Sequence, residues 1–85
     1  MTNNDTTNEN KTMTTKQLTT KITRAYKLVS MLTKTTSITD RTRNQASEFD
    51  RIKSEIIEEF GFDTWENVAV TAGIGGKVNG SDLLA

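Results

Sequence analysis

The feature that most constrains this chain is a set of apolar residues between positions 18 and 32. They follow one another at intervals of four, three, four and three residues: Leu18, Ile22, Ala25, Val29 and Leu32. Such spacing places side chains on one face of an α-helix, whereas a strand needs alternation by two. The sequence therefore predicts an amphipathic helix whose apolar face must be covered by another part of the chain.

The start of this helix is marked by a capping pattern. Thr14 is followed three residues later by Gln17, so each side chain can satisfy a free backbone N–H of the first turn. We expect a helix from about residue 15 to residue 34. Its threonines lower helix propensity, so the helix should depend on packing.

A second apolar face covers the first one in the predicted fold. It consists of Ala46, Phe49, Ile52, Ile56 and Phe60. We expect this helix over about 39–60, beginning after Ser37 or after Thr39 and ending at Gly61. A connector of about five residues favours an antiparallel hairpin. The predicted fold is all-α.

Matching the two faces predicts the alignment of the hairpin. Leu32 should lie near Ala46 and Leu18 near Phe60. Lys21 then faces Glu55, where an ion pair would fix the alignment more than it adds stability.

A short third helix is predicted over residues 64–72, with Asp63 as its N-cap and Gly73 as its stop. Its Trp65 is expected to cover the open end of the hairpin near Leu18 and Phe60. The alternative for Trp65 is that it anchors a partner.

The two ends of the chain differ from this helical domain of residues 14–72. Residues 1–13 are almost entirely polar and are expected to be disordered. Residues 73–85 hold four of the five glycines and are expected to be a flexible tail. This tail also carries Ile74, Val78, Leu83 and Leu84, so three alternatives stay open: folding back, joining an interface, or ordering on binding.

The composition gives no sign of catalysis. The chain has no cysteine, which removes disulfides and thiolate metal sites, and no histidine, the commonest general base and metal ligand. We expect no enzyme activity, no catalytic residue, no metal and no cofactor. Neither a secretory segment nor a membrane span is visible, so a cytoplasmic protein is expected.

The surplus of apolar residues favours protein binding. Six of them are left for partner contacts: Tyr26, Leu28, Met31, Ile57, Trp65 and Val70. A two-helix hairpin of this size usually needs further cover, from the third helix, a second copy or a foreign protein. We therefore expect a small interaction module, an inhibitor or regulator, that forms a homo-oligomer and binds a protein target.

Uneven charge provides an alternative function. Residues 11–43 carry eight Lys or Arg against one Asp, whereas residues 44–85 carry three against eight Asp or Glu. Either the halves attract each other within the hairpin, or the basic half binds nucleic acid. The residues for nucleic acid would be Lys16, Arg24, Lys27, Lys34, Arg41 and Arg43. The acidic half and the lack of interleaved aromatic residues argue against this alternative.

The helical-hairpin outline is similar to two small families, though their motifs are absent. The secreted WXG-type hairpins carry Trp-x-Gly in the turn, which residues 34–39 lack. The hairpin phosphatases of sporulation regulators carry Ser-Gln-x-x-Asp, where this chain has Ser47-Glu48-Phe49-Asp50. No function is carried over from either. The small size and the Asn, Thr, Lys and Ile bias are compatible with a phage or mobile-element accessory protein.

Overall fold

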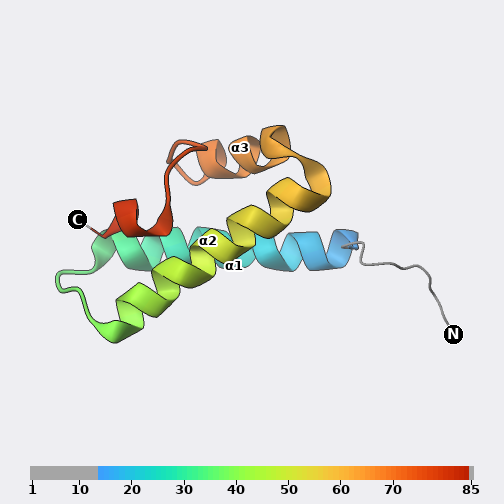
Figure 1. The fold of residues 1–85 in the computed structure, drawn as a ribbon. Helices are drawn as coiled ribbons and strands as arrows, with labels where there is room; N and C mark the ends of the chain where they lie inside the picture. The colour runs from blue at the N-terminus through green and yellow to red at the C-terminus, as the bar shows by residue number, and fades with distance from the viewer. Residues whose placement is uncertain (1–13, 85) are drawn as a thin grey trace, which may run out of the picture.

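The fold is an antiparallel helical hairpin with a third helix and a C-terminal segment packed against it (Figure 1). This computed structural model describes residues 14–84, and the predicted disordered stretch 1–13 lies outside that range. The elements are α1 (Thr15–Lys34), α2 (Asp40–Phe60), α3 (Phe62–Thr71) and a short 3-10 helix, η2 (Gly80–Leu83). The described residues contain no strand, so the all-α prediction is confirmed.

Side-chain caps begin both long helices. The Thr14 hydroxyl accepts from the Gln17 backbone N–H at 3.1 Å, and the Gln17 side chain accepts from the Thr14 N–H at 2.9 Å, as predicted. Of the two starts left open for the second helix, the structure has the later one. Thr39 is its N-cap, and Thr42 completes the reciprocal pair.

The core forms where α1 and α2 cross. Leu28 and Leu32 of α1 pack with Phe49 and Ile56 of α2, and all four are completely buried. The ring of Trp65 in α3 meets Phe49 edge to face, with centroids 5.4 Å apart and planes inclined by 70°. Leu28 was predicted to lie off the seam and free for a partner; that prediction is wrong, because it is part of the core.

The alignment of the hairpin is as predicted for Lys21 and Glu55 and differs at the last turn of α2. Lys21 Nζ lies 2.7 Å from a Glu55 carboxylate oxygen, which confirms that pairing. Phe60, however, is 40% exposed, so the apolar seam ends at Ile56. The helices cross at an angle, and α3 turns back over α2 (Figure 1). Trp65 therefore packs on Phe49 in the middle of α2 rather than at the open end near Leu18.

Glycines shape both ends of α3. Gly61, at φ 94°, ends α2 and also takes the N-cap position of α3, so α3 begins at Phe62 and Asp63 lies in the first turn instead of capping it. Gly73, at φ 87°, follows the helix at the position predicted for the stop. The N–H of Ile74 bonds to the Ala69 carbonyl at 2.9 Å, which is the long hydrogen bond of a Schellman ending.

The C-terminal segment is not a free tail. Residues 75–84 return along α2, and η2 contacts both α2 and α1 near the hairpin connection (Figure 1). Leu83 is buried with the core residues of the helices, and Gly80 lies against α2. The expectation of a flexible tail is therefore corrected to the first alternative, folding back. Among the described residues, no helix combines the length and apolar character that crossing a bilayer requires.

Candidate functional site

The six residues predicted to bind a partner have three different environments. Leu28 and Trp65 are completely buried, and the indole N–H of Trp65 donates to the Gly76 carbonyl at 3.1 Å. Met31 and Ile57 are half-buried against the core. Tyr26 and Val70 remain exposed, by 37% and 64%. Only the last two are thus accessible for contact with another molecule.

Val70 belongs to an exposed face that the sequence analysis did not identify. Phe62, Glu66 and Val70 are spaced four residues apart along α3, so they share one side of the helix, and Asp63 adjoins them. Phe62 is 36% exposed, and the tip of its ring lies beside Gly76 of the C-terminal segment. We call these four residues the outer face of α3. The sequence does contain a signal for this face. Trp65, Val68 and Ala69 form the buried face of α3, so Phe62, Glu66 and Val70 must lie on the other side.

The stretch of sequence that contains the outer face is acidic. Residues 54–76 contain five carboxylates and no lysine or arginine. Besides Asp63 and Glu66, they are Glu55, Glu58 and Glu59 at the end of α2. Phe60 projects from the same stretch and is also exposed. This part of the molecule therefore combines large apolar side chains with negative charge.

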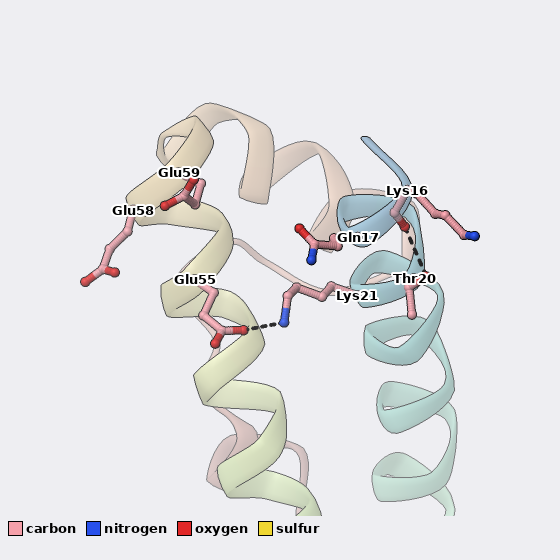
Figure 2. A pocket seen from close by; sticks show the side chains of 7 residues that line it. All are labelled: Lys16, Gln17, Thr20, Lys21, Glu55, Glu58 and Glu59. Carbon is pink, nitrogen blue, oxygen red and sulfur yellow. Dashed lines mark hydrogen bonds and ion pairs between the residues drawn. The ribbon is translucent and has the colours of Figure 1, made fainter. Parts of the chain in front are cut away.

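A hollow of about 570 Å³ separates the start of α1 from the end of α2 (Figure 2). Lys16, Gln17, Thr20 and Lys21 line it from α1, and Glu55, Glu58 and Glu59 from α2. Figure 2 shows Lys21 reaching across to Glu55, while Glu58 points away from the gap.

The chemistry of this hollow is that of a solvated surface. It contains no nucleophile paired with a base, and no group of three metal-ligating side chains occurs among residues 14–84. Its charged side chains are of both signs and partly neutralise one another, as in the pair of Lys21 with Glu55.

A smaller hollow of about 320 Å³ lies between α1 and the end of α3. Its lining consists of Tyr26, Val29, Ser30, Thr33, Lys34, Thr71 and Ala72. Tyr26 is thus placed at a shallow depression, on a different helix from Val70. The structure does not bring these two predicted contact residues into one lining.

The six basic residues proposed for nucleic acid divide into two groups. Arg24 binds Glu48 through two hydrogen bonds, of 2.7 and 3.0 Å, and Arg43 lies 3.3 Å from Asp40. The hydrogen bonds with Arg24 lower the pKa of Glu48, and those with Glu48 raise the pKa of Arg24. Two of the six cations are therefore engaged within the chain.

The other four cations make no ion pair among the described residues: Lys16, Lys27, Lys34 and Arg41. Separations of 11 and 18 residues place the three lysines on one side of α1, because both are close to whole numbers of helical turns. All three are exposed. We call them the lysine stripe.

No protein-family model, curated protein or solved structure matches this chain.

Proposed function

We propose that this protein is a small non-enzymatic module that binds a protein target, as an inhibitor or regulator, through the outer face of α3 and Phe60. One observation carries the proposal. Phe60, Phe62 and Val70 stay exposed within one short stretch, although the twelve buried apolar residues complete a core without them. Apolar side chains gathered on a surface and surrounded by polar groups are characteristic of interaction sites.

The charge around these side chains indicates the chemistry of the target. Glu58, Asp63 and Glu66 surround the apolar side chains in the sequence. A partner with an apolar centre and a lysine- or arginine-rich rim would be complementary to them. Aromatic side chains at the centre would contribute most of the affinity, and the carboxylates would mainly speed association.

The experiment compares two variants that remove exposed apolar side chains from different places. Tagged full-length protein, the Phe62→Ser/Val70→Ser variant and the Ile38→Ser variant are used to capture proteins from the source cell. Ile38 is an exposed apolar residue in the connection between α1 and α2, so it is a matched control.

We expect the wild type and Ile38→Ser to capture one protein, the target, that Phe62→Ser/Val70→Ser does not capture. Mass spectrometry identifies it, and a binding titration with the purified target then measures the loss. Equal retention by all three proteins would show that the outer face of α3 does not bind that target.

The original reason for expecting a homo-oligomer no longer applies. A second copy was predicted because the hairpin needed further cover, and α3 together with η2 supplies that cover within one chain.

Nucleic-acid binding is the second candidate, and the lysine stripe is the observation that favours it. The stripe is accompanied on its side of α1 by hydroxyl residues, such as Thr23 and Ser30, and by no carboxylate. If three lysines contact phosphates, log affinity for duplex DNA should fall with log salt at a slope of about −3. A gel shift at low salt tests this. Lys27→Gln/Lys34→Gln should abolish the shift, and Lys77→Gln should not; no shift with the wild type would exclude this candidate.

A further inference from the structure

The C-terminal segment is bound to the helices as a peptide ligand is bound in a groove. Between Gly76 and Leu83 it has no regular structure except the four residues of η2. It contacts α3 at Gly76 and α2 from Val78 to Gly80, and η2 contacts both α2 and α1. We call the surface that receives it the C-terminal groove, formed by Ala46, Asp50 and Lys53 of α2 with Trp65 of α3.

One part of the groove selects a glycine. The backbone N–H of Gly80 donates to the Asp50 carboxylate at 2.6 Å. A Cβ at position 80 would overlap the carbonyl oxygen of Ala46 and lie 2.8 Å from its Cα. Because these neighbours belong to the helix backbone, they cannot move aside as a flexible side chain does.

A second part of the groove, Lys53, hydrogen-bonds to the two residues just before this glycine. Lys53 Nζ donates to the Val78 carbonyl at 3.2 Å and to the side-chain oxygen of Asn79 at 3.0 Å. Within the segment, the Asp82 carboxylate accepts from the Asn79 N–H at 2.9 Å, which fixes the turn. The two ends of the segment are held by Leu83, which is buried, and by the Gly76 carbonyl, which binds Trp65.

The segment is joined to α3 by a link that contains two glycines, residues 73–75. Gly73 has a positive φ, and a side chain added at Gly73 would meet nothing within 4 Å. Gly75 follows it, and glycine adopts more backbone conformations than other residues, so residues 73–75 can serve as the hinge of an exchange. The Lys53 and Asp50 contacts are only partly buried. Segments held by few buried contacts open before the core does.

We propose that the C-terminal groove also accepts this segment from a second copy of the chain, so that two molecules exchange residues 74–84 and form a dimer. An identical segment makes the same contacts in either molecule, which is why exchange of an element is a low-cost route to dimers. The proposal rests on the groove alone and does not depend on the proposed function.

The balance between the two forms is set by chain concentration. A segment on a short flexible link has an effective concentration of the order of millimolar for its own groove. The wild type should therefore be monomeric at micromolar concentration, with dimer appearing as the protein concentration approaches the millimolar range. Exchange becomes dominant when docking within one chain is blocked.

The test uses two full-length variants that are defective in complementary ways. Gly80→Val has an intact groove and a segment that cannot dock. Asp50→Lys has an intact segment and a groove whose N–H acceptor is replaced by a cation beside Lys53. Only Gly80→Val is labelled with ¹⁵N, so its single Trp65 indole N–H signal reports whether the groove is filled. Sedimentation velocity measures the mass.

Each variant alone is expected to be monomeric, and the indole signal of Gly80→Val should differ from that of the wild type. An equimolar mixture should contain a complex with the mass of two chains, and the indole signal should move back toward the wild-type position. Unlabelled Gly80→Val replaces Asp50→Lys as the control, since it brings no functional segment, and should cause no change.

Three results would overturn the proposal. The first is a mixture that keeps the mass of one chain and an unchanged indole signal. The second is a Gly80→Val protein whose indole signal coincides with the wild type, since Gly80 would then not hold the segment. The third is that a synthetic peptide of residues 74–85 fills the groove of Gly80→Val whereas Asp50→Lys does not. The groove would then bind free peptides but not the segment of a second chain. If Gly80→Val loses its helical circular dichroism, Leu83→Ser takes its place.

Discussion

At the scale of single residues, Trp65 combines a completely buried ring with a buried hydrogen-bond donor. Its ring packs on Phe49, and its N–H is buried with one acceptor, the carbonyl of Gly76. The sequence analysis favoured burial for this residue, which is confirmed, but it also placed Trp65 among the six partner contacts, which its complete burial contradicts. It misplaced the burial site because the indole's acceptor and the α3 crossing arise from contacts between parts of the chain that are distant in sequence.

Trp65→Ala is expected to lower the free energy of unfolding by about 3–5 kcal/mol, because it removes the largest side chain of the core. Trp65→Phe should cost less, since it keeps a ring against Phe49 and mainly leaves the Gly76 carbonyl without its donor. Urea unfolding followed by circular dichroism measures both. Tyr26→Ala, at an exposed position, is the control; an equal loss there would contradict the assignment.

The pair of Arg24 and Glu48 makes the free energy of unfolding depend on pH in the acid range. The folded-state pKa of Glu48 is lowered by its hydrogen bonds with Arg24, so folding favours the ionised form. The stabilisation is complete above the unfolded pKa, about 4.3 for Glu, and is lost as the pH falls through the lower folded-state pKa.

Glu48→Gln should therefore lower stability at pH 7 and lower it much less at pH 2. Because both side chains are partly exposed, the change at pH 7 should be about 1 kcal/mol or less. Urea unfolding at several pH values measures it. A difference between wild type and Glu48→Gln that persists unchanged at pH 2 would show that the ion pair is not its source.

At the scale of elements, α2 organises the molecule, because α1, α3 and η2 all pack on it. The periodic apolar residues of α1 and α2 were sufficient to predict both helices, their antiparallel arrangement and the pairing of Lys21 with Glu55. Helical periodicity and caps are local properties, and they are visible in a sequence. The docking of η2 was not predictable, since it depends on Gly80 fitting a helix backbone more than thirty residues away.

The cap of α2 gives a prediction at this scale. Thr39→Ala removes the hydroxyl that accepts from the Thr42 N–H and should lower the free energy of unfolding by about 1 kcal/mol. Thr39→Ser keeps an acceptor and should restore most of the loss. Thermal unfolding of the three proteins compares them. No difference between the alanine and serine variants would mean that the cap contributes little.

At the scale of the whole molecule, the described residues form one core with two differently charged surfaces. The lysine stripe lies on α1, whereas the carboxylates gather at the end of α2 and on α3. The sequence predicted this division of charge. It did not predict which cations would be engaged, since the pairing of Arg24 with Glu48 depends on the alignment of two helices. Nor did it identify the outer face of α3, because it placed Phe60 in the seam between the two long helices and gave Phe62 no role in binding.

Hydrogen exchange should show a graded stability across the molecule. Amides of α1 and α2 near Phe49 and Leu28 should be the slowest, while Gly80 and Leu84 should exchange faster even though both N–H groups are hydrogen-bonded. Native-state exchange followed by NMR measures this order. If the amide of Gly80 were as protected as those of the helix centres, the C-terminal segment would be part of the main cooperative unit, and its exchange between molecules would require global unfolding.

Gly61 has a consequence for how this chain is built. It is the single residue between α2 and α3, and nothing crowds the space where a side chain would stand. The constraint there is its dihedral angle, which L-residues rarely adopt. A residue that prefers ordinary helical angles would favour continuing α2 as one long rod, with Trp65 carried away from Phe49. The hinge between a straight helix and a closed molecule is thus one achiral residue.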